Sequence, residues 1–357
     1  MSFPPNKKLR VAVICGGTSN EREVSLKSGQ QVLKHLDPEK YEASLLEIAA
    51  DGRWILNGEE KIPLQIDVAQ PTDLQGMVAA SSQGLEGAPS SRLCDVAFIA
   101  LHGAFGEDGG IQALLDLLKI PYTGSGVLAS SLCMNKGQTR KLVAGLGVAL
   151  PRSLSFYRRS GVSIQEMDTR IERELQYPCI IKPNASGSSV GVSLVKSREM
   201  LAEALERAFK EDEVILAEEY IHGRELTCGV LGNASVGGET IVLPPVEIIP
   251  DGEFFDYEAK YASAETKEVC PARLDEAQMT EVKRLAEQIH VGIGCDGLSR
   301  TDFILRDQTF YFLETNTIPG LTEQSLCPKE AAAAGMTFGD FLGKQIELAR
   351  EKFGRNI

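Results

Sequence analysis

The chain has 357 residues, of which 37 are basic and 50 are acidic, so its formal net charge at pH 7 is −13. Hydrophobic residues make up 43% and charged residues 24%, which excludes a disordered or fibrous protein and leaves enough chain for two or three domains of roughly 150 residues. A nucleic-acid partner is disfavoured, because contact with phosphate backbones requires a basic surface.

The first apolar run predicts a buried strand. Runs such as residues 11–15 are far shorter than the roughly 18 to 20 residues that cross a bilayer, so no membrane partner is expected. Lys7, Lys8 and Arg10 precede this run as they would in a signal peptide, but Gly-Gly-Thr-Ser follows in place of a cleavage site. Residues 9–15 therefore predict a strand of a parallel sheet, buried on both faces.

The next hundred residues continue this pattern of strands and helices, as in an open parallel sheet. The predicted elements are a helix at 24–36, strands at 41–48 and 96–101, and a helix at 111–118. A stretch at 71–92 is rich in Gly, Ser, Gln and Ala, and it predicts a surface insertion.

The rest of the chain predicts an α+β arrangement in short pieces. The predicted helices are 130–144, 199–209 and 275–289, and the predicted strands are 179–182, 190–195, 214–220, 225–231, 241–249, 302–305 and 309–314. The eight cysteines show neither C-x-x-C nor zinc-site spacing, so reduced thiols in a cytoplasmic protein are expected.

A set of oxygen ligands stands near the end of the chain. Asp302 begins one predicted strand, and Glu314 and Asn316 end the next. If the two strands are antiparallel neighbours, alternation places these side chains on one face, where hard oxygen atoms suit Mg²⁺ together with nucleotide phosphates. The alternative is an ordinary pair of solvated strand ends; Arg300, two residues before Asp302, favours the metal site.

A second group predicts a nucleotide clamp. Lys182 closes a predicted strand, and a Gly-Ser-Ser-Val-Gly loop follows at 187–191, where backbone N–H groups can close on phosphate oxygens. The loop alone would equally suit a plain turn, but Lys136, Glu218 and Glu225 favour the clamp. The chain has no Walker A sequence, and no G-x-G-x-x-G follows the first strand, which disfavours a dinucleotide fold.

Taken in order, several blocks resemble D-alanine:D-alanine ligases of the ATP-grasp superfamily. The blocks are GGTSNEREVS at 16–25, HGAFGEDG at 102–109, DYEAKY at 256–261 and ETNTIPG at 314–320. The resemblance implies an α/β N-terminal open parallel-sheet domain at 1–130 and a two-part α+β ATP-grasp fold, with a central lid at 131–220 and a catalytic domain at 221–357. It also implies a cytoplasmic homodimer that supplies peptidoglycan precursors.

The implied reaction has two stages. The carboxylate of one D-alanine takes the γ-phosphoryl group of ATP, and the amine of a second D-alanine then displaces phosphate from the acyl phosphate. The resemblance assigns two Mg²⁺ or Mn²⁺ ions to Asp302, Glu314 and Asn316, the ATP phosphates to Lys136, Lys182 and Lys260, and the nucleoside to Glu218 and Glu225.

Substrate contacts are implied in the same way. Arg300 and the backbone N–H of Gly320 resemble the oxyanion donors. Glu21, with His102 close by, matches the position that holds the first ammonium group, and Ser325 with the backbone beside Leu326 matches the position that receives the second carboxylate. Glu21, Ser188 and Tyr261 match a hydrogen-bonded trio, and Tyr261 favours a dipeptide over a D-lactate ester product.

The sequence departs from the commonest family pattern at Ala104, Asn135 and Thr315, none of which removes a charge or ligand named above. Three rivals stay open. Another ATP-grasp ligase would lack the blocks around Glu21, Tyr261 and Ser325. A regulatory protein that kept only the fold would be expected to have lost a ligand or Arg300, and a redox enzyme would need a glycine fingerprint or a thiol pair.

Overall fold

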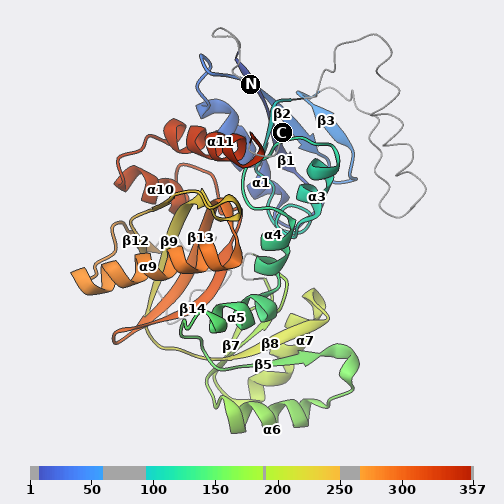
Figure 1. The fold of residues 1–357 in the computed structure, drawn as a ribbon. Helices are drawn as coiled ribbons and strands as arrows, with labels where there is room; N and C mark the ends of the chain where they lie inside the picture. The colour runs from blue at the N-terminus through green and yellow to red at the C-terminus, as the bar shows by residue number, and fades with distance from the viewer. Residues whose placement is uncertain (1–7, 59–93, 188–189, 250–265, 355–357) are drawn as a thin grey trace.

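The computed structural model describes residues 8–58, 94–187, 190–249 and 266–354. Within these ranges the strands form three separate sheets: the first from residues 9–56 and 96–99, the second from residues 224–316, and the third from residues 153–219 (Figure 1). The predicted insertion at 71–92 lies outside the described residues. None of the described helices is long and apolar enough to cross a bilayer.

The first sheet is an open, mainly parallel sheet, as predicted. Strands β1 (Leu9–Gly16), β2 (Tyr41–Ile48) and β4 (Val96–Ile99) are parallel, and the short strand β3 (Trp54–Leu56) pairs antiparallel with β2 at one edge. The sheet has helices on both faces: α1 (Arg22–His35) and α11 (Phe338–Gly354) share a core with one, and α3 (Gly110–Leu117) with the other.

Helix α1 can lie directly against the sheet at Gly29 because this residue has no side chain. A Cβ atom at Gly29 would come 2.5 Å from the Cβ of Cys15 on β1. The close approach brings two buried hydroxyls of α1, those of Ser25 and Ser28, to the ends of the parallel strands. The carboxyl end of an open parallel sheet is where ligands usually bind.

The second sheet is antiparallel and carries most of the polar residues of interest. Its strands are β9 (Arg224–Asn233), β10 (Thr240–Val242), β11 (Val246–Ile249), β12 (Lys267–Val269), β13 (Asp296–Arg306) and β14 (Thr309–Asn316). Helix α9 (Glu276–Ile293) packs on one face, and α10 (Leu326–Ala333) and α11 pack on the other.

Two predicted strands of this sheet differ from the observed ones. The single strand predicted at 241–249 is wrong, because Pro244 and Pro245 have no N–H to donate and separate β10 from β11. Strand β13 begins at Asp296, six residues before the predicted start, and it pairs with β9 along its length.

The third sheet is also antiparallel, with the order β5-β8-β6-β7. Its strands are β5 (Ser153–Tyr157), β6 (Cys179–Pro183), β7 (Ser193–Val195) and β8 (Val214–Glu219), and helices α6 (Ile164–Glu174) and α7 (Leu201–Glu211) complete its core. Short 3₁₀ turns occur at Arg158–Ser160, Arg198–Met200 and Ala234–Val236.

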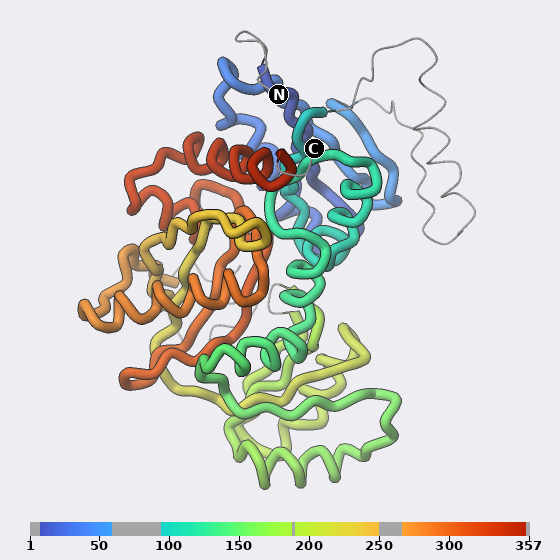
Figure 2. Tube along the Cα trace, in the orientation of Figure 1, coloured from blue at the N-terminus to red at the C-terminus, as the bar shows by residue number. Residues whose placement is uncertain are grey.

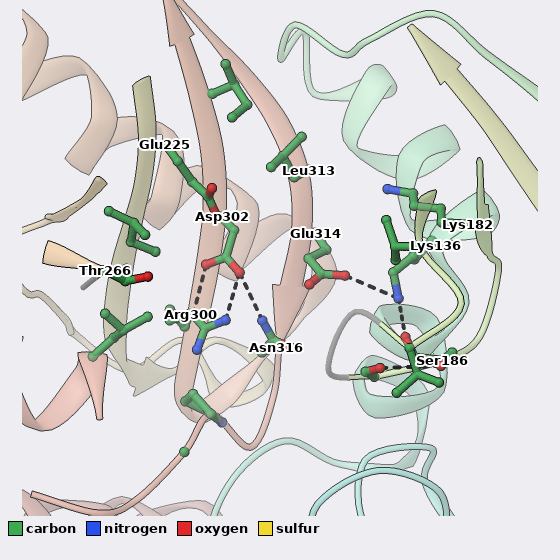
Figure 3. Close-up of a pocket in the computed structure, with 18 of the residues that line it drawn as sticks. Lys136, Lys182, Ser186, Glu225, Thr266, Arg300, Asp302, Leu313, Glu314 and Asn316 are labelled. Atoms are coloured by element: carbon green, nitrogen blue, oxygen red, sulfur yellow. Dashed lines mark hydrogen bonds and ion pairs between the residues drawn. The ribbon is translucent and has the colours of Figure 1, made fainter. Parts of the chain in front are cut away.

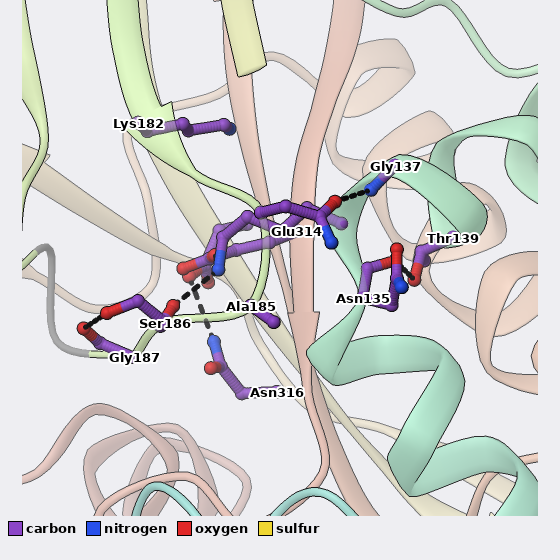
Figure 4. Close-up of polar contacts among 12 residues, drawn as sticks. Asn135, Gly137, Thr139, Lys182, Ala185, Ser186, Gly187, Glu314 and Asn316 are labelled. Atoms are coloured by element: carbon purple, nitrogen blue, oxygen red, sulfur yellow. Dashed lines mark hydrogen bonds and ion pairs between the residues drawn. The ribbon is translucent and has the colours of Figure 1, made fainter. Parts of the chain in front are cut away.

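The single helix predicted at 130–144 is two helices, α4 (Val127–Met134) and α5 (Lys136–Gly145). The break is at Asn135, whose side-chain oxygen accepts a hydrogen bond from the backbone N–H of Gln138 at 3.1 Å and so caps α5. The backbone N–H of Gly137 donates to Oδ1 of Asn184 at 2.8 Å, which ties α5 to the chain after β6 (Figure 4).

Helix α11 joins the first and second sheets. Its buried residues Phe341, Leu342 and Ile346 belong to one hydrophobic cluster with Val13 of β1 and Leu298 of β13. In the trace, α11 lies between the N-terminal segment and the strands of the second sheet (Figure 2). The two sheets therefore share a core. All eight cysteines are free thiols, and only Cys270 is not fully buried.

Candidate active site

A cavity of about 920 Å³ opens between the parts of the chain that carry the three sheets, and polar side chains from each part line it. Figure 3 shows the side of the cavity where Lys136, Asp302 and Glu314 lie. Every predicted site residue that the structure describes lines this cavity. They are Glu21, His102, Lys136, Lys182, Glu218, Glu225, Arg300, Asp302, Glu314, Asn316, Gly320 and Ser325. The other three predicted residues, Ser188, Lys260 and Tyr261, lie outside the described residues.

The register of β13 and β14 brings the predicted oxygen ligands together. Asp302 pairs with Glu314 and Arg300 with Asn316, and a bulge follows between Asp302 and Phe303. The side-chain amide of Asn316 donates to Oδ2 of Asp302 at 3.3 Å. The prediction of two neighbouring antiparallel strands is confirmed, and Asp302, Glu314 and Asn316 face the same cavity.

Arg300 holds Asp302 through a two-pronged contact. Its Nε donates to Oδ1 at 2.8 Å and its Nη2 to Oδ2 at 2.7 Å, while the Thr227 hydroxyl donates to Oδ1 at 2.5 Å. Burial works to lower the pKa of the Arg300 guanidinium, but the charge and hydrogen bonds of Asp302 raise it above its ordinary value. A fixed positive charge therefore lies in the cavity wall beside the carboxylate.

Two buried lysines reach the cavity from the other side. Nζ of Lys136, the first residue of α5, lies 3.2 Å from Oε2 of Glu314 and donates to the carbonyl oxygen of Ser186 at 2.6 Å. Nζ of Lys182, on β6, lies 2.7 Å from Oε2 of Glu218. Figure 4 draws Lys182, Ser186 and Glu314 at this meeting of the second and third sheets.

Glu218 is shared between two cations. Arg140 of α5 approaches its other carboxylate oxygen at 3.1 Å, and only 3% of Glu218 is exposed. Arg140 was not predicted from the sequence. The two ion pairs fix the Glu218 carboxylate at the wall of the cavity, which Lys182 also lines.

Glu21 lies where α1 meets the chain after β6. A Cβ atom at Gly187 would overlap Oε1 of Glu21, so glycine here leaves room for the Glu21 carboxylate in this position. Glu107, which the sequence analysis missed, accepts a hydrogen bond from the backbone N–H of Gly103 at 2.8 Å. Burial, together with the nearby charge of Glu21, raises the pKa of Glu107 to about 8. Its place in the HGAFGEDG block was the available signal.

His102 and Ser325 lie at the ends of elements that face the cavity. His102 follows β4, is 4% exposed, and has both ring nitrogens within hydrogen-bond distance of protein oxygens. Ser325 precedes the first residue of α10, and its hydroxyl accepts from the backbone N–H of Thr322 at 3.1 Å. A Cβ atom at Gly320 would come 2.9 Å from Oγ of Ser325, so these two groups share one corner of the cavity.

Glu247 is another residue that was not predicted from the sequence. It lies on β11 between two arginines: Nε of Arg224 donates to Oε1 at 2.8 Å, and Arg273 donates through Nε and Nη2 at 2.8 and 2.9 Å. Burial works to raise the pKa of Glu247, but the hydrogen bonds and charges of the arginines outweigh it and lower the pKa to about 2. All three side chains line the cavity.

The donor set on β13 and β14 fits a hard divalent cation. Two carboxylates and one amide supply oxygen atoms on one face, and their present partners, Arg300 and Lys136, show that this face attracts positive charge. Within the described ranges, no group of three His, Cys, Asp or Glu side chains could hold a metal ion. A metal here would use the amide of Asn316 and, as is usual for Mg²⁺, oxygen atoms of a phosphate substrate.

Comparison with known proteins agrees with this geometry. The family profiles described as "D-ala D-ala ligase N-terminus" and "D-ala D-ala ligase C-terminus" match residues 10–125 and 142–347. A D-alanine–D-alanine ligase from Syntrophobacter fumaroxidans is 41% identical over 97% of this chain and 99% of its own, and one from Pelotomaculum thermopropionicum is 40% identical over 97% and 98%.

Solved structures give the same result. The D-alanine–D-alanine ligase of Coxiella burnetii matches with a TM-score of 0.79 and 27% identity over 98% of this chain and 96% of its own. The VanG D-Ala:D-Ser ligase of Enterococcus faecalis matches with a TM-score of 0.78 and 31% identity over 96% and 100%. The sequence, the fold and the arrangement of the cavity agree, and the chain belongs to the D-alanine–D-alanine ligase family.

Proposed function

We propose that this chain joins two molecules of D-alanine at the expense of ATP, giving D-alanyl-D-alanine, ADP and phosphate for peptidoglycan synthesis. The observation that carries the proposal is the cavity face on β13 and β14, where Asp302, Glu314 and Asn316 lie opposite two buried lysines. Membership of the family supplies the substrates.

The reaction makes two demands on the site. In the first stage a carboxylate oxygen of one D-alanine attacks the γ-phosphorus of ATP, and the bond to the ADP oxygen breaks. In the second stage the amine of the other D-alanine attacks the acyl carbon, the bond to the phosphate oxygen breaks, and the amine gives up a proton. Both stages build negative charge on oxygen, which fixed positive groups stabilise.

The nucleotide is proposed to lie between the second and third sheets. Lys136 and Lys182 would hold its phosphates, and Glu218 and Glu225 would contact the nucleoside. The lysine contacts support this role, because both ammonium groups are held by protein oxygens near the oxygen-ligand face. A solved structure of a Bacillus anthracis D-alanine–D-alanine ligase complexed with ATP matches this chain with a TM-score of 0.74 and 28% identity over 98% of this chain and 100% of that one.

Asp302, Glu314 and Asn316 are proposed to hold two Mg²⁺ or Mn²⁺ ions. Bound there, the ions would neutralise charge on the phosphate oxygens and keep the reacting groups in line. Arg300 and Lys136 orient the two carboxylates into the cavity. The donor set is therefore preorganised by the protein itself.

The amino acid substrates are proposed to lie between the first and second sheets. Glu21 would hold the first ammonium group with His102 nearby, Arg300 and the Gly320 N–H would stabilise the developing oxyanion, and Ser325 would receive the second carboxylate. The N-terminus of α10, which begins beside Ser325, favours an anion there. The proposed roles of Ser188, Lys260 and Tyr261 belong to residues outside those described.

We propose domain boundaries at 1–130, 131–220 and 221–357, because each of the three sheets is built from strands within one of these ranges. A cytoplasmic homodimer is proposed with them. Sedimentation of the purified chain at several concentrations would test the dimer, and a monomer at every concentration would contradict it.

The function is tested by measuring ADP release with ATP, Mg²⁺ and each of D-alanine, L-alanine, D-alanine with D-lactate, and D-alanine with D-serine. We expect turnover that depends on D-alanine and yields the D-alanyl-D-alanine dipeptide. No dependence on D-alanine would refute the proposal, whereas a mixed product with D-serine would move the chain toward the relatives represented by VanG.

The metal face is tested by Asp302→Asn, which keeps the volume of the side chain but removes its charge. We expect turnover to be lost while thermal unfolding stays cooperative. Asp95→Asn is the matched control, because Asp95 also accepts two hydrogen bonds from an arginine side chain, that of Arg10, away from the cavity. Full activity of Asp302→Asn would show that the metal face is misassigned.

A further inference from the structure

Ser28 lies behind the cavity wall and contacts a residue that the proposed function uses. It is fully buried in α1, and its Oγ lies 2.9 Å from Nε2 of His102. His102 lines the cavity, whereas Ser28 does not. The imidazole is therefore the contact through which the Ser28 hydroxyl can act on the cavity.

The contact of the second ring nitrogen of His102 indicates which of the two nitrogens carries the proton. Nδ1 is 3.2 Å from the carbonyl oxygen of Ile318, and a carbonyl oxygen can only accept. Nδ1 must therefore carry the proton. In a neutral imidazole this leaves Nε2 with its lone pair, so the hydroxyl of Ser28 donates to it.

We propose that Ser28 is a positioning residue, which holds His102 as the Nδ1–H tautomer and so fixes the carbonyl of Ile318 at the start of the Ile318-Pro-Gly320 turn. The proposal rests on the proposed function, in which the N–H of Gly320 is an oxyanion donor. It assigns His102 the task of orienting this turn, since both of its ring nitrogens are engaged by protein oxygens.

The contact is built into the packing of α1. Gly29 allows the helix to lie against Cys15 of β1, and this places the Ser28 hydroxyl at the strand ends. The backbone of His102 is held as well, because the Ser19 hydroxyl donates to its carbonyl oxygen at 2.7 Å. The imidazole thus bridges α1 and the Ile318 turn, which lie about 290 residues apart in the sequence.

Ser25 provides a matched control one helical turn earlier. It is also fully buried, and its hydroxyl donates to the carbonyl of Ala100 at 2.7 Å and accepts from the N–H of Gly16 at 2.8 Å. Its partners are backbone groups only. Ser25→Ala and Ser28→Ala therefore each remove one buried hydroxyl from the same helix, but only Ser28→Ala changes the partner of His102.

The tautomer can be read directly in the intact enzyme. The chain has four histidines, so ¹⁵N-histidine labelling gives a simple long-range ¹H–¹⁵N spectrum, and loss of signals in His102→Gln assigns the ring. We expect Nδ1 to be protonated and Nε2 to be unprotonated. A protonated Nε2 with a bare Nδ1 would overturn the proposal, whatever the activity, and this measurement needs no Ser28 variant to fold.

The functional consequence is tested by kinetics. We expect Ser28→Ala to lower kcat by about tenfold or more, because a small misplacement of an oxyanion donor is costly, while KM for ATP changes by less than about twofold. The His102 signals should move in the same variant. Ser28→Thr, which keeps a hydroxyl, should restore most of kcat and the wild-type signals.

Ser25→Ala should lower the melting temperature about as much as Ser28→Ala but leave the His102 signals and kcat near those of the wild type. Equal kcat losses in both variants, with unchanged His102 signals, would reduce Ser28 to a packing role and overturn the proposal. If the wild type shows no D-alanine-dependent ADP release, the proposed function fails instead, and the ring spectrum still decides the tautomer.

Discussion

Glu247 offers a quantitative test of the electrostatics around the cavity. Its pKa is lowered from 4.5 to about 2 by two arginines, although its side chain is almost completely buried. At about 1.4 kcal/mol for each pKa unit, a shift of about 2.5 units corresponds to roughly 3 kcal/mol of stability at pH 7. Because Arg224 and Arg273 are partly exposed and screened by solvent, this figure is an upper value.

The sign of the pH dependence follows from the direction of the shift. A carboxyl group whose pKa is lower in the folded state contributes its full stabilisation above pH 4.5 and loses it as the pH falls toward 2. Glu247→Gln should therefore destabilise the protein most at neutral pH, and its difference from the wild type should narrow below pH 4.5. Urea denaturation followed by fluorescence at several pH values measures both effects.

Glu281→Gln is the control for this prediction. Glu281 pairs with Arg284 one turn along α9, but both side chains are largely exposed, so its removal should cost no more than about 1 kcal/mol. If Glu247→Gln costs no more than Glu281→Gln at pH 7, or if its effect is the same at every pH, the assignment of a strongly stabilised Glu247 carboxylate is refuted.

Three further changes test other parts of the structure. The wild type should lose stability as the pH rises from about 4.5 to about 8, because the folded protein holds the proton of Glu107 more tightly than the unfolded chain does, and Glu107→Gln should abolish this loss. Melting temperatures of the two proteins that change in parallel from pH 5 to 9 would contradict this. Asn135→Ala should cost about 1 kcal/mol in urea denaturation through loss of the α5 cap, whereas Asn135→Asp should cost little, and equal losses would count against the cap. Gly229→Ala should cost about 1 to 3 kcal/mol, because the added methyl group meets Oε2 of Glu330, and it should cost clearly less in a Glu330→Ala background; an unchanged cost there would exclude that contact as the cause.

The parts of the site that could be predicted are those with local signals. Asp302 and Glu314 belong to one hairpin, so the alternation of side chains and a short turn are enough to place them on the same face. Strand β1 was predictable because a strand buried on both faces is a continuous apolar run. The resemblance to the family then placed Glu21 and Ser325 in one substrate site, which no hydrophobic periodicity could have done.

Residues that depend on distant partners could not be predicted in this way. The low pKa of Glu247 comes from Arg224 and Arg273, which lie on other segments, and the high pKa of Glu107 comes from burial and Glu21. Strands β3 and β12, with three residues each, are too short to show a pattern. Helix α6 did carry a signal, because Ser163 caps it and Met167 and Ile171 are buried at helical spacing.

The break at Asn135 shows a different limit. Residues 130–144 have a helical pattern throughout, and periodicity cannot register a single residue whose side chain ends one helix and begins another. Proline is an easier signal, and Pro244-Pro245 in the predicted strand at 241–249 should have divided it. Rules for capping and for proline therefore add information that hydrophobic spacing lacks.

The position of α11 has a consequence for folding during synthesis. One face of the first sheet is covered by α1 and also by Phe341, Leu342 and Ile346 of α11, which follow the strands of this sheet by more than two hundred residues in the chain. During translation this apolar face therefore stays partly uncovered while more than two hundred further residues are synthesised. We therefore expect residues 1–130, if produced alone, to fold poorly and to aggregate. We also expect nascent chains to depend on chaperones until α11 packs on the sheet.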